Sequence, residues 1–410
     1  MESLKIKNFG PIGEGNPEND GWIDIGKVTV FIGNQGSGKS TVAKLISTFS
    51  WMEKALVRGD FTQRELERKN KLKSKFLSYH RIDEYLSDNT LIEYKGDAYY
   101  IRYENGFMHI EENANQRYPL PQIMYVPAER NFLSYMKKAS EIKLSSPALQ
   151  EFLVEFDNAK NTIKSPVQLP VNNAQLEYHK LTDTLYIKGG RYRIQLGNAS
   201  SGFQSFVPLT LVSNYLANRV KGDAGSGELM SGDEIARFRK SIGEIISNKS
   251  LTEEQRRIAI SELSGKFNKT AFLNIVEEPE QNLFPSSQRG VLYSLLSANK
   301  SSLGNKLVIT THSPYIINYL SLSVQGGHLA DRIKSLTLSA ELMDRMEKIV
   351  PKDAVLNVAD LLIYELNENE GTINSLSNYQ GIPSDENYLN MSLREGNELF
   401  DKLLEIEEEL

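Results

Sequence analysis

The sequence has no cysteine and only five histidines among its 410 residues. The absence of cysteine excludes a disulfide framework, cysteine-ligated zinc or iron–sulfur clusters, and thiol catalysis, and five scattered histidines argue against a histidine-only metal site. No run of apolar residues approaches the ~20 needed to cross a bilayer, and the first residues lack the apolar stretch of a signal peptide. We therefore expect a cytoplasmic protein with no membrane contact.

Positive and negative side chains are nearly balanced, with 47 Lys+Arg against 53 Asp+Glu and a formal net charge of −6. This balance argues against a globally basic nucleic-acid binder, although a local basic surface fits within such a total. The length allows two or three domains, or one domain with large insertions, and the hydrophobic content of 40% is enough for a buried core.

A glycine-rich loop is the strongest motif. The apolar run at residues 28–32 is typical of a strand buried on both faces, and apolar residues at helical spacing follow from position 42. Between them, residues 33–40 satisfy G-x-x-x-x-G-K-[ST], the phosphate-binding loop, whose context makes a chance glycine turn a poor explanation. The residues expected to contact a nucleotide are Gly33, Asn34, Gln35, Gly36, Ser37, Gly38, Lys39, Ser40 and Thr41.

This loop predicts ATP and Mg²⁺ as the ligands. Backbone amides would converge on the α- and β-phosphates, and Lys39 would reach the β- and γ-phosphates. The Ser40 hydroxyl would be a Mg²⁺ ligand.

Two carboxylates and one histidine follow further apolar runs. Glu277 and Glu278 end the run that starts at residue 272, and they are suited to position Mg²⁺ and to activate a water molecule, respectively. The alternative is an acidic turn that only caps a strand. His312 follows another buried run, where it can sense a γ-phosphate or fill a structural role.

Several motifs together resemble the ABC-type ATPase heads, in particular the soluble RecF/SMC-like and OLD-like branch. They also resemble the standalone ATPases of bacterial anti-phage systems such as PARIS and Septu. The motifs that carry the resemblance are residues 33–41, Ser-Ser-Gly-Phe-Gln at 200–204, Ile-Val-Glu-Glu-Pro-Glu at 275–280, Thr-His-Ser-Pro at 311–314, Lys-Ile-Lys-Asn-Phe at 5–9 and Tyr-Val-Pro-Ala-Glu-Arg at 125–130.

The resemblance implies roles for individual residues. Ser201, Gly202 and Gln204 would match the signature motif, which closes over the γ-phosphate bound by a partner subunit. Glu278 would be the catalytic glutamate and His312 the switch histidine. The Q-loop glutamine stays open, because Gln122 precedes its strand and Glu129 and Arg130 follow it.

Departures from the family pattern are also informative. Glu277 stands where an aspartate is more usual, and Phe203 replaces a common glycine, so slow turnover is expected. The interval between Ser40 and Ser200 is too short for long coiled-coil arms, since a helix advances about 1.5 Å per residue. No Asp-x-Asp cluster of a Toprim nuclease follows residue 351, so any nuclease activity would belong to a partner.

The predicted fold is an α/β ABC-type head with a β-meander lid, a helical signature subdomain and a C-terminal cap. Residues 1–50 and 271–350 would form the ATP-binding core, 51–198 the lid region, 199–270 the signature subdomain and 351–410 the cap.

The predicted function is ATP hydrolysis by paired heads, in the sensor or scaffold of an anti-phage system that controls a toxic effector nuclease. A RecF-like DNA-repair or DNA-binding ATPase is the alternative, and a transporter subunit is disfavoured. The basic run at residues 68–75 would either contact nucleic-acid phosphates or form the wet face of a helix. The acidic end of the chain could dock on a partner, although we expect Leu399, Leu403 and Ile406 to pack on the chain's own core.

Overall fold

The computed structural model describes residues 1–113, 118–135, 144, 146–222, 232–248, 256, 263, 269–334 and 339–408. Much of residues 223–268, which belong to the predicted signature subdomain, therefore lies outside the described part.

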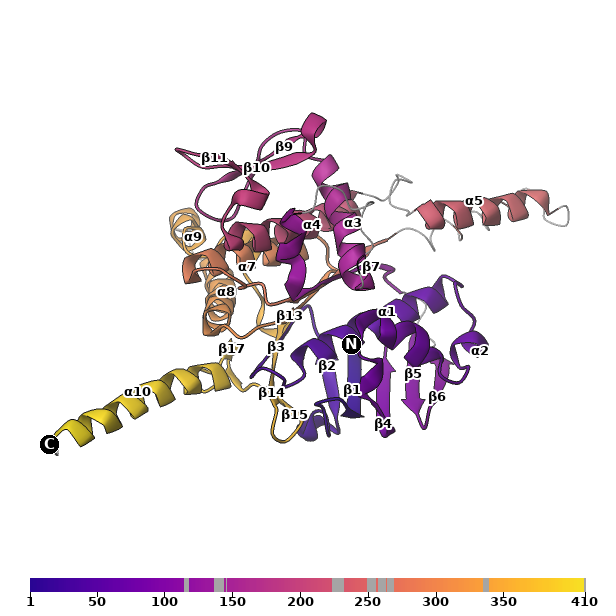
Figure 1. Cartoon of the computed structure of the whole chain (residues 1–410), viewed down its shortest axis with the longest axis horizontal. Coiled ribbons are helices and arrows are strands. Elements are labelled where there is room, and N and C mark those ends of the chain that lie inside the picture. Colours follow the sequence, from indigo (N-terminus) through magenta and orange to yellow (C-terminus); the bar gives the residue numbers. More distant parts are fainter. Residues whose placement is uncertain are drawn as a thin grey trace.

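A six-stranded, mostly parallel sheet forms the centre of the molecule (Figure 1). Five strands lie side by side in the order β7-β12-β13-β3-β14, and each neighbouring pair is parallel. β15 pairs antiparallel with β14 at the edge of the sheet. The strands are β3 (Val28–Gly33), β7 (Pro121–Val126), β12 (Ala271–Glu277), β13 (Lys306–Thr310), β14 (Leu361–Asn367) and β15 (Thr372–Ser375).

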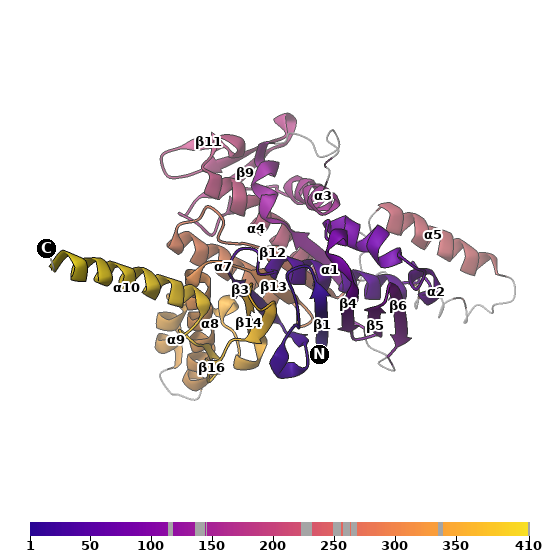
Figure 2. The same cartoon turned by 60° about the horizontal axis from the view of Figure 1, so that its bottom comes forward.

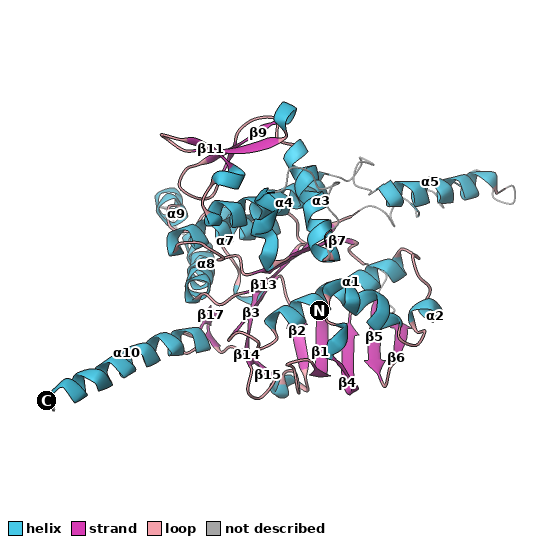
Figure 3. Ribbon diagram, viewed as in Figure 1, coloured by secondary structure: helices cyan, strands magenta, loops and turns pink. Residues whose placement is uncertain are grey.

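Both faces of this sheet are covered, which explains the unbroken apolar runs of its strands. Alternate residues of β3 point to opposite faces: Val30 and Ile32 join one core cluster and Phe31 the other. One face packs against α1 (Lys39–Val57), and the other packs against α4, α7 and α8 (Figure 3). These three helices are α4 (Ser201–Gly222), α7 (Pro285–Lys300) and α8 (Pro314–Ile333).

A five-stranded antiparallel sheet lies on the other side of α1, in the order β2-β1-β4-β5-β6. The β-meander predicted for residues 91–111 is confirmed, because β4, β5 and β6 pair consecutively. Apolar and polar residues alternate along these strands, so the apolar side chains lie on one face of the sheet and the polar side chains on the other. The strands are β1 (Glu2–Phe9), β2 (Trp22–Ile25), β4 (Leu86–Lys95), β5 (Tyr99–Glu104) and β6 (Phe107–Glu112).

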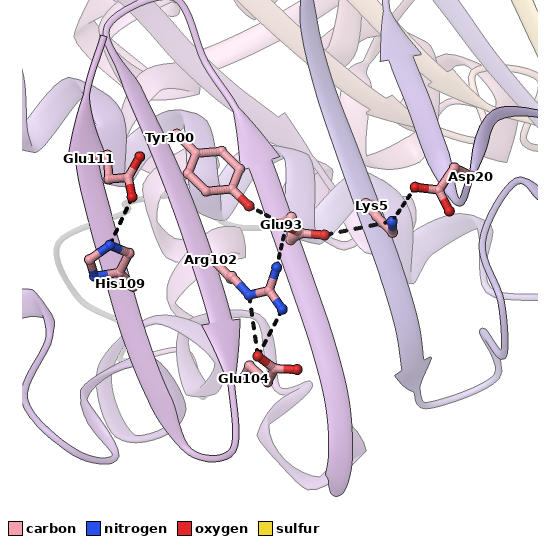
Figure 4. A network of polar contacts seen from close by, with 8 residues as sticks. All are labelled: Lys5, Asp20, Glu93, Tyr100, Arg102, Glu104, His109 and Glu111. Atoms are coloured by element: carbon pink, nitrogen blue, oxygen red, sulfur yellow. Dashed lines mark hydrogen bonds and ion pairs between the residues drawn. The ribbon is translucent and has the colours of Figure 1, made fainter.

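The polar face of this sheet carries a network of ion pairs (Figure 4). Glu93 lies at its centre, where it accepts a hydrogen bond from Arg102 Nη1 at 2.9 Å and another from the Tyr100 hydroxyl. Lys5 bridges to Asp20 at 2.9 Å, and Arg102 also contacts Glu104. The Arg102–Glu104 pair is exposed on both sides and is worth only about 0–1 kcal/mol. Glu93 is largely buried, so loss of one of its partners would cost more.

The remaining elements surround these sheets. A four-stranded antiparallel sheet in the order β11-β10-β9-β8 lies beyond α4 (Figure 1). No helix in the described part of the chain is both long and apolar enough to cross a membrane. The elements are α2 (Gln63–Leu66), a π-helical turn η2 (Leu72–Leu77), η3 (Ser78–His80), η4 (Asp83–Tyr85), η5 (Ala128–Tyr135), α3 (Pro147–Asn161), β8 (Val167–Gln168), β9 (Gln175–His179), β10 (Thr184–Lys188), β11 (Arg193–Gln195), α5 (Gly232–Ser247), α9 (Ser339–Glu347), β16 (Asn378–Tyr379), β17 (Ile382–Pro383) and α10 (Tyr388–Glu408).

The division of the chain drawn from the sequence needs two corrections. The central sheet includes β7, which the sequence analysis assigned to the lid, and β14 and β15, which it assigned to the cap. Both assignments were wrong for the same reason: a parallel sheet joins strands that are distant in sequence, so contiguous ranges cannot describe it.

The terminal helix α10 also differs from expectation. It has no buried residue and extends away from the body of the molecule (Figure 2). Leu399, Leu403 and Ile406 are 53%, 63% and 58% exposed, so the prediction that they pack on the chain's own core was wrong. The amphipathic pattern is present, but no element of the described chain covers the apolar face of this helix.

Candidate functional site

The glycine-rich loop joins β3 to α1 at the carboxyl end of the parallel sheet, as the sequence predicts. Gly36 has a φ of 80°, a left-handed conformation that favours glycine. At Gly33 a Cβ atom would lie 2.5 Å from the Leu366 carbonyl oxygen, so only glycine fits beside β14. Asn34, Gln35, Gly36 and Ser40 are exposed, whereas Ser37, Gly38 and Thr41 are buried.

Lys39 begins α1 and turns back over the loop. Its Nζ donates to the carbonyl oxygens of Gly33 at 2.9 Å and Asn34 at 2.6 Å. Burial lowers the pKa of Lys39 to about 8, and the carboxylates of Glu278, Glu280 and Glu368 oppose that shift. The ammonium group is therefore held at the loop by carbonyl oxygens, where an arriving phosphate would offer it a charged partner.

The parallel register brings the other predicted residues to the same edge. β12 ends at Glu277, and its neighbour β13 ends at Thr310, two residues before His312. The backbone N–H of Glu278 donates to the Thr310 carbonyl at 2.9 Å, which fixes the two strand ends against each other. The structure thus gathers the loop, both glutamates and the histidine at one edge of the sheet.

Glu278 adopts a left-handed backbone conformation with a φ of 44°, unusual for a non-glycine residue. Its Oε1 lies 3.5 Å from His312 Nε2, and both side chains are about one third exposed. Hydrogen bonding to His312 is the main cause that lowers the pKa of Glu278. The strained backbone thus directs an ionised carboxylate toward the loop side of the sheet, the state that a general base requires.

Glu277 is buried and only partly satisfied. Its Oε2 accepts a hydrogen bond from the Ala128 backbone N–H at 3.2 Å, while its Oε1 has no hydrogen-bond partner within the described chain. A buried carboxylate oxygen without a partner is costly, so a ligand or an ion's water shell at this position would relieve that cost.

Arg130 holds this edge together, a role that the sequence analysis missed. The side chain is 0% exposed and donates to the carbonyls of Glu277 at 2.6 Å and Glu278 at 2.5 Å. It also donates to the carbonyls of Pro127 and, on helix α4, Ser205. Burial lowers the pKa of Arg130 to about 10, which leaves it charged at neutral pH. Arg130 therefore couples the end of β12 to helix α4.

Glu280 and Glu368 complete the acidic surroundings of Lys39, and neither was predicted. Glu280 accepts from the His312 backbone N–H at 2.7 Å, which orients the segment that carries the histidine. Glu368 accepts from Asn34 Nδ2 at 2.8 Å and from the Tyr388 hydroxyl at 3.2 Å. Glu368 lies in the β14–β15 turn, far from any motif, so no sequence signal pointed to it.

The predicted signature residues lie at the start of α4. Ser201 is exposed, and Gly202 packs so closely that a Cβ would lie 2.9 Å from the Asn282 carbonyl oxygen. The Gln204 amide donates to the carbonyls of Gly197 and Ala199, so it holds its own turn. Of the three, Ser201 therefore presents a polar side chain outward.

The register of β7 bears on the open Q-loop question. Gln122 pairs with Phe272, near the amino end of β12 and away from the nucleotide edge. Glu129 is exposed just beyond the carboxyl end of β7, beside Arg130. The segment at 129–130 is therefore the one that reaches the edge.

The residues present fit a nucleotide with Mg²⁺ better than a metal held by protein alone. Among the described residues, no group of three or more His, Asp or Glu side chains is arranged to hold a metal ion. The exposed Ser40 and the unpartnered Glu277 Oε1 suit an ion that takes its other ligands from phosphates and water.

Comparisons with known proteins bear on the fold. No protein-family model and no curated protein sequence match the chain. Similar solved structures include an SMC head domain from Thermotoga maritima, with 10% identity, a TM-score of 0.37 and coverage of 92% of this chain and 98% of that one.

Two further structures are similar over most of their length. One is an Smc head domain from Pyrococcus furiosus with an extended coiled coil, bound to the C-terminal domain of ScpA, with 11% identity, a TM-score of 0.33 and coverage of 98% and 100%. The other is an ATP-binding cassette of an ABC transporter, with 12% identity, a TM-score of 0.28 and coverage of 91% and 90%. The α/β fold class is as predicted, and the chain's own strand order and its strand–loop–helix unit at the glycine-rich loop carry it.

Proposed function

We propose that this protein binds ATP at the glycine-rich loop and hydrolyses it. One observation carries the proposal. Lys39 of the loop and the ionised Glu278, which lies beside His312, come together at one edge of the sheet. An acidic turn that merely capped a strand would not need the strained backbone of Glu278 or the buried arginine that fixes it.

In the proposed mechanism, Lys39 leaves the loop carbonyls and pairs with the β- and γ-phosphates. Glu278 orients the attacking water and accepts its proton, while His312 holds the Glu278 carboxylate in place. Bound Mg²⁺ would supply charge neutralisation of the phosphates, held by Ser40 and, through water, by Glu277.

A second head would complete the site. The exposed Ser201 at the N-terminus of α4 can add a hydroxyl donor and helix-dipole charge to a γ-phosphate bound by another subunit. ATP would then hold two heads together and hydrolysis would release them. Gln204 is expected to shape this turn rather than to contact the nucleotide.

The wider role that we propose is a sensor or scaffold ATPase in anti-phage defence that holds a toxic effector nuclease. Helix α10 supports a protein partner, because it exposes Phe400 and several leucines on a predominantly acidic helix. Its first residue, Tyr388, bonds Glu368, which in turn bonds the phosphate-loop residue Asn34. A partner on α10 would therefore be attached close to the nucleotide.

The substitution Glu278→Gln tests the ATPase and the pairing together. We expect hydrolysis to fall by a factor of about 10² to 10⁴, since a general base contributes that much, while ATP binding persists. Size-exclusion chromatography with ATP and Mg²⁺ should then show a trapped dimer or larger oligomer. Lys39→Ala is the matched control that should neither bind ATP nor dimerise. An elution volume of Glu278→Gln that ATP does not change would contradict the pairing.

A DNA-driven ATPase of RecF type is the second candidate, favoured by the basic run at residues 68–75, which is mostly exposed. Hydrolysis stimulated by DNA, with a steep dependence on salt, would support it. Hydrolysis indifferent to DNA, together with co-purification of a nuclease partner, would support the scaffold.

A further inference from the structure

A pocket with a volume of about 170 Å³ opens beside the second half of helix α1, between that helix, β7, α3 and the turns at residues 75–80. Trp51 on its wall lies twelve residues beyond Lys39, or about 18 Å along the helix. The pocket is therefore separate from the phosphate loop. It is smaller than the ~300–1,000 Å³ typical of sites for drug-sized ligands, so it suits a single ring system.

Aromatic side chains form most of its walls. Trp51 is 39% exposed and lies 5.7 Å from Phe76, measured between ring centroids. Tyr79 and Tyr125 line the same pocket, and each packs edge-on against the His80 ring at 4.8 Å. Such walls favour a flat ligand that stacks, because stacking and edge contacts with rings are both available.

The pocket also contains a hydrogen-bonding group with no partner. His80 is 5% exposed, and its Nδ1 makes no hydrogen bond within the described chain. Burial lowers the pKa of His80 to about 3, so the ring is neutral and offers one donor and one acceptor. A buried polar atom without a partner favours a ligand whose edge carries complementary donors and acceptors.

The mouth of the pocket is basic. Residues 68–75 contain five Lys or Arg and no acidic residue, and Lys75 itself lines the pocket. The one carboxylate in the lining, Glu151, accepts a hydrogen bond from the Tyr79 hydroxyl. Lys75 Nζ stands 4.2 Å from the centroid of the Phe61 ring, next to Trp51. A ligand that enters with its ring inside would thus leave an attached anionic group among these lysines.

From this combination we propose that the pocket binds a nucleobase that carries a phosphate, either in a free nucleotide or as an unpaired base of a single-stranded nucleic acid. The aromatic walls would stack the base, His80 would bond its edge, and the run at residues 68–75 would contact the phosphate or the sugar-phosphate backbone. An aromatic side chain of a protein would fill the walls but would use neither the unpartnered His80 nor the lysines. The site does not depend on the ATPase proposed above.

The test uses Trp51 as its own reporter. The chain has two tryptophans, so Trp22→Phe leaves Trp51 as the single tryptophan, which is excited selectively over the 19 tyrosines. We expect thymidine monophosphate or a single-stranded oligothymidylate to quench its fluorescence without ATP or Mg²⁺ present. The quench should persist in Lys39→Ala, which separates this pocket from the phosphate loop. Tighter binding of the oligonucleotide would identify nucleic acid as the source, and tighter binding of the monophosphate would identify a free nucleotide.

Variants define the expected losses. Trp51→Leu lacks the reporter, so its binding is measured by titration calorimetry. It should bind the better ligand about tenfold or more weakly, since stacking one base accounts for that much. Lys73→Gln with Lys75→Gln should weaken binding too and, for an oligonucleotide, reduce the salt slope by about 1.4. The matched control is Lys334→Gln with Lys348→Gln, which removes the same charge at α8 and α9 and should change neither value.

Two results would overturn the proposal. One is the absence of quenching and of oligonucleotide binding at 50 mM salt. The other is oligonucleotide binding that depends on Lys73 and Lys75 but is unchanged in Trp51→Leu, because that would describe a basic surface with an unused pocket.

Discussion

The two ends of helix α1 face sites of opposite character. At its N-terminus, Lys39 lies among glutamates, and every charged group there has a partner in the loop or at a neighbouring strand end. Near its C-terminus, Trp51 borders an aromatic pocket in which the buried His80 is neutral and its Nδ1 has no partner among the described residues. One helix thus separates a polar site, in which Lys39 has partners while Glu277 Oε1 lacks one within the described chain, from an apolar pocket with an unpartnered nitrogen.

The difference shows two ways of preparing a site for a ligand. The loop end keeps Lys39 on carbonyl oxygens that a phosphate can replace, so binding there exchanges partners. The pocket keeps a desolvated nitrogen without any partner, so binding there would add one. Exchange costs little in the empty protein, whereas an unsatisfied polar atom costs about 1–3 kcal/mol until it is occupied.

The largest predicted effect concerns Arg130, which fixes the polar end. Arg130→Leu should lower the free energy of unfolding by about 3–5 kcal/mol, since it removes a buried charge and leaves carbonyls of two strand ends and of α4 unpaired. The measurement is the midpoint of urea unfolding.

Arg102→Leu is the matched control, because Arg102 is also an arginine with several partners but is 38% exposed on its side chain in the network of Figure 4. Its loss should cost less than that of Arg130, about 1–3 kcal/mol, because the largely buried Glu93 keeps Tyr100 and Lys5 as partners. Equal shifts for the two arginines would mean that burial does not distinguish them, and the tie between α4 and the strand end would lose its support.

A smaller effect, about 2 kcal/mol at pH 5, concerns His80 in the pocket. Its pKa is about 3 in the folded chain and about 6.5 when unfolded. The unfolded state therefore takes up a proton first as the pH falls below 6.5. Stability should decrease by about 1.4 kcal/mol per pH unit between roughly pH 6 and pH 3, and it should be unaffected above pH 7.

His80→Phe should remove this part of the acid dependence while it leaves the stability at pH 7 within about 1–2 kcal/mol. Unfolding midpoints at pH 7, 5 and 4 measure it. His109→Asn serves as the matched control, because it removes a histidine whose side chain is 64% exposed. An acid slope that is identical in His80→Phe would rule out a neutral, desolvated histidine in the pocket.

The smallest effect is the uptake of a fraction of a proton by Lys39 when ATP binds. The pKa of Lys39 is about 8 in the free protein, and pairing with phosphates would raise it. At pH 8, ATP binding should therefore take up about half a proton, and at pH 6.5 almost none. Titration calorimetry in buffers of different ionisation enthalpy measures the uptake. Lys39→Arg should show none at either pH, and uptake that is equal at both pH values would refute the shift.

Much of the polar site could be predicted because its residues follow strands directly. The loop at 33–40 is contiguous, and Glu277, Glu278 and His312 end buried runs, so a parallel sheet must bring them to one edge. The β-meander was predictable for a similar local reason, an Asn-Gly turn between alternating runs.

The parts that were missed are those that depend on non-local packing. Glu368 belongs to a turn after β14, and nothing local shows that β14 pairs with β3. The pocket draws on four separate segments, of which only the basic run was singled out from the sequence. For α10 the pattern was read correctly, but amphipathicity alone cannot say whether a helix meets its own core or extends outward.

Helix α10 has a mechanical consequence. Its 21 residues make a rigid arm about 31 Å long, attached through Tyr388 to Glu365 and Glu368, of which Glu368 also bonds the phosphate loop. For an arm of that length, a pivot of about 10° at its base moves the far end by roughly 5 Å. The hydrogen bonds from Asn34 to Glu368 and from Tyr388 to Glu368 lie at the base of this helix. A sub-ångström shift of the loop that tilts the base would therefore move the far end of α10 by several ångströms.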